Sequence, residues 1–284
     1  MSRILFCLSV IAIVLTLPAK VAANAPATAL PLLAEGKHIS VIHGFNDTHP
    51  PATLASMQAR WQEALAAGMT VGRIQIDWPD LEIGPRQYDK ANLRERLEEM
   101  RSAGLQPFVL LSTIDSEGYT LPADLLDPAG PTRLADGKRF DDPAILERFR
   151  HLLDWVVPML VEHGAWVLAV GNEPGNHLTD HPSEIDSVVN FMEAARTHAH
   201  SLDARLAITM TLAYYNVEVA PSFQPRLIEL SDVASFNYYG ATSEFYFDDS
   251  RSSVHAEIDH MLRLAGDKQL ILQELGGSAG YKDA

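Results

Sequence analysis

The sequence contains almost no cysteine: its 284 residues include one, Cys7. That residue lies in the N-terminal apolar segment described below, so the rest of the chain has no thiol for a disulfide, a catalytic cysteine or a thiolate metal site. A glycine-rich phosphate loop and a dinucleotide-binding fingerprint are also lacking in the sequence. We therefore expect a fold that is held by its core alone and a function that uses no cofactor.

Positive charge is scarce as well. The chain has 22 Lys and Arg against 37 Asp and Glu, which gives a formal net charge of −15 at pH 7. This balance disfavours functions that neutralise phosphate groups, so we expect neither nucleic acid nor anionic lipid as a partner. Hydrophobic residues, by contrast, make up 47% of the chain, which is enough for a sizeable core and excludes a disordered or collagen-like protein.

The N-terminus has the pattern of a secretory signal. Arg3 precedes a mostly apolar run over residues 4–17, which Pro18 ends, and small residues follow. This order predicts a signal peptide over residues 1–23, because the run is shorter than the ~20 apolar residues of a spanning helix. The alternative is an uncleaved anchor. We expect a secreted or periplasmic protein in which residues 24–284 form the functional domain and, after cleavage, make no membrane contact.

From residue 37 onward the chain repeats one unit. An apolar, β-branched run ends in polar residues, a loop follows, and then an amphipathic helix ends at glycine. Runs that are apolar almost throughout are typical of strands buried on both faces of a parallel sheet. Seven such strands are predicted, over residues 39–45, 71–78, 107–114, 166–171, 205–211, 232–239 and 269–274.

Strands that alternate with helices fit either a doubly wound sheet or a (β/α)8 barrel. Polar residues follow nearly every predicted strand, which favours the barrel, because an open sheet concentrates its functional residues at one switch point. A barrel has eight strands, whereas the sequence shows seven and then ten further residues. We therefore expect an α/β protein with a (β/α)8 TIM barrel truncated after strand 7; the alternative is a missed strand.

Two glutamates end otherwise apolar strands. Glu173 follows the fourth predicted strand, and Glu274 ends the seventh. Burying an unpaired carboxylate costs several kcal/mol, so a purely structural role for both is a poor explanation. Barrel enzymes collect their catalytic groups at the C-terminal ends of the strands. We therefore predict that Glu173 and Glu274 are catalytic residues that face one cleft.

The positions of these glutamates resemble those in a known group of enzymes. Asn172-Glu173-Pro174 after strand four, with Glu274 after strand seven, is similar to the large clan of retaining β-glycosidases with (β/α)8 barrels. The resemblance covers most of residues 24–284. It extends to the second strand, which carries Arg73, and to three further segments: residues 44–46 and 235–240 resemble the ends of strands one and six, and residues 273–276 look galactanase-like.

The resemblance implies a retaining glycoside hydrolase that cleaves β-linked poly- or oligosaccharide by double displacement. It implies that Glu173 is the general acid/base and Glu274 the nucleophile. Retaining enzymes hold their two carboxyl groups ~5–5.5 Å apart. At an effective dielectric constant of ~20, charges at that separation repel by ~3 kcal/mol, or ~2 pKa units, so one carboxyl stays protonated as the acid.

Further residues are expected to bind the carbohydrate substrate. By the resemblance, Asn172 would hold the 2-hydroxyl group of the sugar, while Arg73 and Tyr239 would orient Glu274. The remaining candidates follow from their places at strand ends. They are Asn237, which shares a strand face with Tyr239, Asn46 at the end of the first strand, and Trp78, a candidate for stacking on a sugar ring.

Other patterns lead to weaker alternatives. The third strand lacks the histidine of cellulase-like members, which argues against that subgroup. The Gly-x-Ser-x-Gly pattern at residues 276–280 has no histidine after it, so a serine hydrolase is rejected. His177 and His181 could ligate a metal, but their Pro-flanked loop favours a solvated surface pair. Two alternatives stay open: a non-catalytic carbohydrate-binding barrel, and a metal-dependent barrel that uses His43, Asp77 and Glu173.

Overall fold

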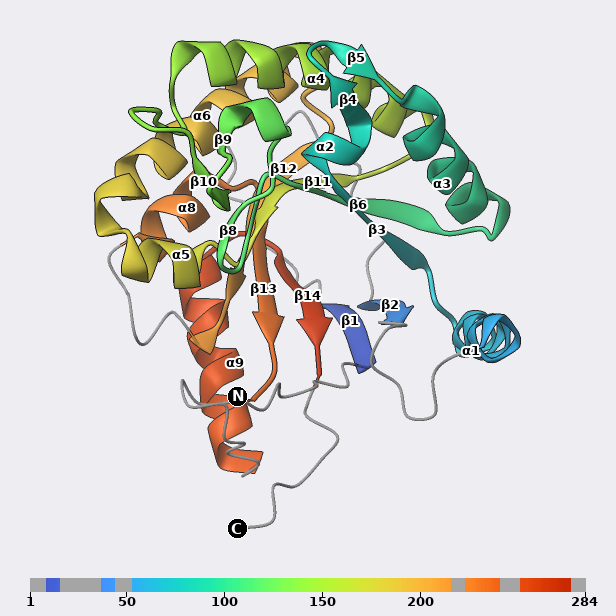
Figure 1. The fold of residues 1–284 in the computed structure, drawn as a ribbon. Helices are drawn as coiled ribbons and strands as arrows, with labels where there is room; N and C mark the ends of the chain where they lie inside the picture. Colours follow the sequence, from blue (N-terminus) through green and yellow to red (C-terminus); the bar gives the residue numbers. More distant parts are fainter. Residues whose placement is uncertain (1–8, 16–36, 44–52, 216–222, 241–250, 277–284) are drawn as a thin grey trace.

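A computed structural model describes residues 9–15, 37–43, 53–215, 223–240 and 251–276. Its centre is a curled sheet of parallel strands with helices packed outside it (Figure 1). Six of the strands follow one another in sequence and in space. They are β3 (Val71–Asp77), β6 (Gln106–Ser112), β11 (Val167–Asn172), β12 (Ala207–Ala213), β13 (Ala234–Tyr238) and β14 (Leu270–Leu275).

The order of the sheet confirms the predicted fold class. Beyond β14 the sheet continues through β1 (Ser9–Leu15) to β2 (Lys37–His43), and β2 lies beside β3 at the other end of the order. The six strands curl as a half-barrel with consecutive neighbours, as in a (β/α)8 barrel and unlike a doubly wound sheet. All seven predicted strands are present, with bounds shifted by a few residues.

β1 lies within the expected signal peptide. It pairs antiparallel with β14 on one side and with β2 on the other, and Ile13 is opposite both Leu272 and Ile39. Because two antiparallel steps restore the direction, β2 runs parallel to β14 and to the other barrel strands. The cleavage of residues 1–23 stays a prediction.

Helices cover the outer face of the sheet. The long ones follow their strands along the chain, as the repeated unit predicts (Figure 1). They are α1 (Leu54–Ala66), α3 (Lys90–Ser102), α4 (Pro143–Glu162), α6 (Ile185–Leu202), α8 (Gln224–Leu230) and α9 (Arg251–Ala265). No helix in the described part of the chain is long and apolar enough to cross a membrane.

Short elements fill the loops at the C-terminal ends of the strands. The helical turns are α2 (Trp78–Leu81), η1 (Ala123–Leu125), α5 (Gly175–Asp180) and η2 (Pro182–Glu184). The hairpins pair β4 (Glu82–Gly84) with β5 (Gln87–Tyr88), β7 (Ile114–Asp115) with β8 (Gly118–Tyr119), and β9 (Leu126–Asp127) with β10 (Gly130–Leu134).

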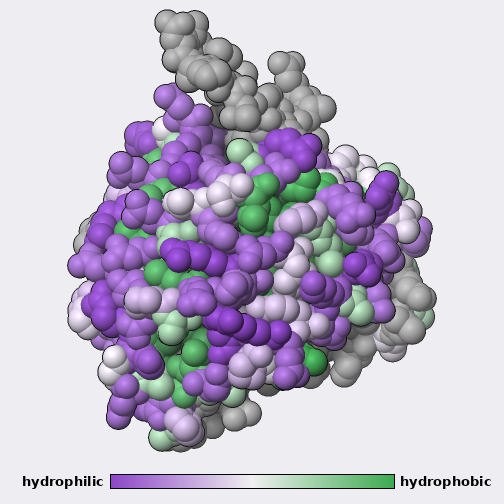
Figure 2. All heavy atoms as spheres, turned by 90° about the horizontal axis from the view of Figure 1, so that it is seen from above, coloured by the Kyte–Doolittle hydropathy of each residue, from purple (hydrophilic) through white to green (hydrophobic). Residues whose placement is uncertain are grey.

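Two apolar clusters hold the fold. The larger one lies between the sheet and the helices, where Leu93 and Leu97 of α3 and Phe149 of α4 are buried. The smaller one lies inside the curl and includes Phe108 and Ile271. On the face seen in Figure 2 the surface is mainly hydrophilic, with apolar residues in small groups. The two clusters lie on opposite faces of the strands, because successive side chains of a strand point to opposite sides of the sheet.

Candidate active site

Polar side chains gather inside the sheet at the C-terminal ends of the strands, because the alternation of side chains between the two faces is broken in two of them. Between Ala169 and Asn172, β11 advances three residues while β12 advances two. Between Leu272 and Glu274, β14 advances two residues while β13 advances one. Each irregularity is one extra residue, a β-bulge, and bulges re-aim the side chains that follow them. Both bulges directly precede the candidate catalytic glutamates.

Glu274 is held at both of its carboxylate oxygens. Arg73 of β3 forms an ion pair with it, with 3.0 Å between Nη2 and Oε1, and the two side chains are 6% and 14% exposed. The hydroxyl of Tyr239 donates a hydrogen bond to Oε2. Burial and the negative charge of Glu274 raise the pKa of Tyr239 above its ordinary value, so its hydroxyl remains a donor at neutral pH. These contacts fix the orientation of the Glu274 carboxyl group at the end of β14.

Glu173 is also held at both oxygens, but by neutral donors. Asn237 Nδ2 donates to Oε1 over 2.8 Å, and Ser116 Oγ donates to Oε2 over 3.1 Å. Burial, and next the charge of Glu274, raise the pKa of Glu173 to about 7. The group therefore gives up its proton only around neutral pH, which suits a carboxyl group that has to act as an acid.

The backbone of Glu173 has a left-handed conformation. Its φ is +45°, which is uncommon for a residue other than glycine. Its amide donates to Thr211 O over 2.8 Å, which ties the residue to the end of β12. Strained conformations of this kind cost of order 1–3 kcal/mol and cluster at functional sites.

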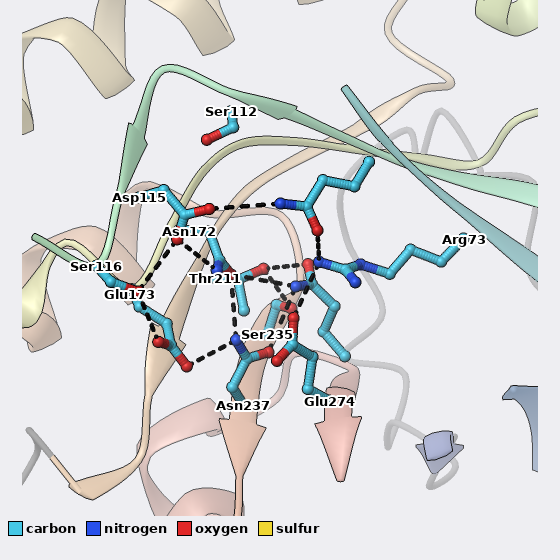
Figure 3. Close-up of polar contacts among 12 residues, drawn as sticks. Arg73, Ser112, Asp115, Ser116, Asn172, Glu173, Thr211, Ser235, Asn237 and Glu274 are labelled. Atoms are coloured by element: carbon cyan, nitrogen blue, oxygen red, sulfur yellow. Dashed lines mark hydrogen bonds and ion pairs between the residues drawn. The ribbon is translucent and has the colours of Figure 1, made fainter. Parts of the chain in front are cut away.

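An amide network lies beside Glu173, which it contacts through Asn237 (Figure 3). Asn172 Oδ1 accepts hydrogen bonds from Asn237 Nδ2 (3.1 Å) and Gln273 Nε2 (3.2 Å). Gln273 Oε1 in turn accepts from Thr211 Oγ1 over 2.6 Å. All four side chains are buried, with 0–5% of the residue exposed. Buried and hydrogen-bonded in this way, the network makes the strand ends a rigid platform.

Two further carboxyl groups lie beside this network. Asp115 accepts from Asn172 Nδ2 over 3.0 Å, and burial raises its pKa. The pKa of Asp77, at the end of β3, rises to about 6 through burial and the nearby charges of Asp80 and Asp115. Perturbed carboxyl groups gathered at the strand ends are typical of an active site.

The structure brings together most of the residues that the sequence analysis singled out. Arg73 and Tyr239 contact Glu274, while Asn172 and Asn237 belong to the network beside Glu173. Asn46 lies outside the described residues.

The expectation for Trp78 is wrong. Its side chain is fully buried, it donates to Glu82 Oε2 over 2.6 Å, and its ring packs against Phe149 with centroids 4.9 Å apart. Trp78 begins the short helix α2 after β3, which turns the indole away from the strand ends and into the core. A side chain without exposed surface has no face on which a sugar ring can stack.

The expectation of a solvated histidine pair is wrong in part. His177 is 3% exposed, and its Nε2 lies 2.9 Å from Glu184 Oε2. The ring packs edge-on against Tyr119, because α5 folds this segment back over the β7–β8 hairpin. Among the described residues, no group of three or more His, Cys, Asp or Glu is arranged to hold a metal ion.

Sequence reasoning missed Ser116 and Gln273. Ser116 lies in a loop with no motif, and its contact with Glu173 spans 57 positions of sequence. Gln273 precedes Glu274 in a strand, so strict alternation would place the two on opposite faces. Nothing in the residue types signals the bulge that brings both into the site.

No protein-family model and no curated protein sequence matches the chain. Solved structures do. The chain is similar to a GH5_18 from Bifidobacterium longum subsp. infantis (17% identity, TM-score 0.57), over 75% of this chain and 52% of that one. It is also similar to a GH5_18 variant from Streptomyces cattleya in complex with Manβ1-4GlcNAc (14% identity, TM-score 0.56), over 72% of this chain and 51% of that one. A third similar structure is the β-glycosidase BGL167 (15% identity, TM-score 0.54), over 76% of this chain and 66% of that one.

The chain therefore spans about half to two thirds of the length of these structures. At identities of 14–17% such a likeness shows the fold, a (β/α)8 barrel of the kind found in glycoside hydrolases. The function has to be argued from the chemistry at the strand ends.

Proposed function

We propose that this protein is a retaining glycoside hydrolase that cleaves β-linked poly- or oligosaccharide by double displacement. One observation carries the proposal: Glu173 and Glu274, 101 positions apart, both lie beside Asn237, which donates to the Glu173 carboxyl group and is the β13 residue paired with Glu274 of β14. Glu274 is paired with a guanidinium, whereas Glu173 has neutral hydrogen-bond donors and a pKa of about 7. A nucleophile and a general acid need this difference.

In the first step Glu274 attacks the anomeric carbon of the substrate. A bond forms from a carboxylate oxygen to that carbon while the glycosidic carbon–oxygen bond breaks, and Glu173 gives its proton to the leaving oxygen. Arg73 and the Tyr239 hydroxyl orient the nucleophile, one at each carboxylate oxygen. The product of this step is a covalent glycosyl-enzyme.

In the second step the ionised Glu173 removes a proton from water. The water oxygen attacks the anomeric carbon and releases Glu274, so the configuration is retained after two inversions. Burial and the charge of Glu274 together raise the pKa of Glu173, and once Glu274 is esterified the second cause disappears. The pKa of Glu173 therefore falls in the glycosyl-enzyme, which favours its role as the base of the second step.

The substrate class rests on the resemblance of the strand-end motifs and on the similar structures. A β-glycosidase and a complex with the β-linked disaccharide Manβ1-4GlcNAc are among them. That this chain acts on the same class of β-linked sugars is part of the proposal. A screen with β-mannosides, β-glucosides, β-galactosides and β-galactan tests the class, including the galactanase-like motif of residues 273–276.

The decisive experiment compares Glu173→Gln and Glu274→Gln on two aryl β-glycosides, one with a poor leaving group and one with a dinitrophenyl leaving group. Both variants should lose about 10²–10⁴-fold of the activity on the poor leaving group. Only Glu173→Gln should keep the first step with dinitrophenol, which leaves without a proton. Glu95→Gln, an exposed change on α3, is the control.

The other outcomes identify the alternatives. Near-wild-type hydrolysis by either glutamine variant would contradict the proposal. Sugar binding with no turnover on any substrate would select the carbohydrate-binding barrel, and activity lost to chelators and restored by metal would select the metal-dependent barrel. Proton NMR of the first-formed anomer distinguishes retention from inversion.

We also propose export with removal of residues 1–23. The support is the order of a charged start, a short apolar run and small residues at the N-terminus. N-terminal sequencing of the protein recovered from the periplasm or medium tests this, and a mature form that begins at Met1 would refute it.

A further inference from the structure

Ser116 lies between two carboxyl groups of the candidate site (Figure 3). Its Oγ is 3.1 Å from Glu173 Oε2 and 3.1 Å from Asp115 Oδ1. A serine hydroxyl carries one proton and therefore donates to one carboxylate at a time. The two acceptors compete for the same hydrogen bond.

The backbone of Ser116 is fixed for this position. Its amide donates to Asn172 O over 3.2 Å, and its carbonyl accepts from the His177 amide over 3.0 Å. Its φ is +42°, a second left-handed residue that faces the left-handed Glu173. Because a non-glycine residue in this region is strained, the surrounding contacts hold it there.

The segment behind Ser116 is buried and hydrogen-bonded. The Tyr119 hydroxyl donates to Glu184 Oε2 over 2.6 Å, the same oxygen that His177 Nε2 contacts. Tyr119 and His177 are 2% and 3% exposed, and their rings meet edge-on at 4.9 Å. The β7–β8 hairpin is therefore anchored to α5, and the hydroxyl of Ser116 is presented from a rigid loop.

We propose that Ser116 is a positioning residue for Glu173 and that Asp115 is the second acceptor of its hydroxyl. The inference rests on the proposed function. When Glu173 is ionised, Ser116 donates to it and holds the base toward the incoming water. When Glu173 carries the proton, the hydroxyl turns to Asp115, and the carboxyl group is released from this contact to deliver its proton.

The two neighbours act on Glu173 in opposite directions. The Ser116 hydrogen bond favours the ionised form of Glu173, while the negative charge of Asp115 disfavours it. Removing the hydroxyl should raise the pKa of Glu173, and removing the charge of Asp115 should lower it. A role limited to folding would not give shifts of opposite sign.

The test is the pH dependence of kcat/KM on an aryl β-glycoside with a poor leaving group, measured on the full chain. Its alkaline limb reports loss of the Glu173 proton. Ser116→Ala and Ser116→Gly should both move this limb up by about one pH unit, and Asp115→Asn should move it down. Glycine adopts the left-handed conformation without penalty, so Ser116→Gly keeps the test valid even where Ser116→Ala fails to fold.

Thr120→Ala is the matched control. The Thr120 hydroxyl lies in the same loop, 3.0 Å from Ser112 Oγ, and we expect no shift of the limb when it is removed. An unmoved limb in both Ser116 variants, or shifts of the same sign for Ser116 and Asp115, would overturn the inference. Such a result leaves the proposed function intact as long as Glu173→Gln and Glu274→Gln are inactive; active glutamine variants would refute the function itself.

Discussion

Tyr239→Phe removes one oxygen atom from the site, and its effect can be worked out from the contacts of Glu274. The Tyr239 hydroxyl donates to Oε2 of Glu274, while Arg73 holds the other oxygen at 3.0 Å. A hydrogen bond to a charged group contributes about 1.5–3 kcal/mol. At 1.36 kcal/mol per factor of ten, its loss should lower kcat/KM about 10- to 100-fold, with Arg73 still holding the nucleophile.

Tyr238→Phe is the control, because it makes the same chemical change one residue earlier. Tyr238 points to the opposite side of β13, where its hydroxyl donates to Glu257 of α9. The kcat/KM of the Tyr238→Phe variant, calculated for the folded protein, should stay within twofold of wild type. The assay is kcat/KM on an aryl β-glycoside, with thermal unfolding to compare the amounts of folded protein. Equal losses in both variants would refute the reasoning, since they would show that the hydroxyl of Tyr239 acts through stability.

Two further predictions concern stability. The pKa of Glu173 is about 7 in the folded protein against an ordinary value of 4.5, so the stability of the wild type should fall as the pH rises from 4.5 to 7. Glu173→Gln removes this loss, so urea unfolding should show the variant gaining up to about 3 kcal/mol relative to wild type between pH 4.5 and pH 8. An equal stability difference between variant and wild type at both pH values would contradict the assigned pKa. Arg148→Met should destabilise the fold by about 3–5 kcal/mol, because it leaves the buried Glu82 carboxylate without the guanidinium whose Nε lies 2.7 Å from it. Arg226→Met, in the exposed pair with Asp186, should have no measurable effect, and similar urea midpoints for the two variants would argue against a structural role for the buried pair.

The sequence predicted the strands well because each one is a short apolar run between punctuating residues. The two ends of α3 illustrate the same strength: Asp89 caps its start by accepting from the amides of Ala91 and Asn92, and Gly104 follows its end with φ of +74°. Local chemistry of this kind depends on neighbouring residues only, so it is readable without coordinates.

The site was predictable where alternation holds and not where it breaks. Asn237 lies in β13 and Tyr239 directly follows that strand, and each contacts a candidate catalytic glutamate, as their shared face predicts. Gln273 and Trp78 were misjudged for one reason: the backbone leaves the regular strand beside them, at a bulge in one case and at a helical turn in the other. Aromatic character alone does not distinguish a residue that faces a sugar from one that faces Phe149.

The two bulges also bear on how such an enzyme could lose its activity in evolution. Loss of the single codon for Gln273 would remove the extra residue of β14 and put the glutamate in the place of Gln273, where it would face Thr211 and Asn172 instead of Arg73 and Tyr239. The gene would still encode both glutamates in recognisable surroundings, and the sheet could still pair. A homologue that keeps every motif residue but has one residue fewer between Leu272 and Glu274 is therefore expected to be inactive.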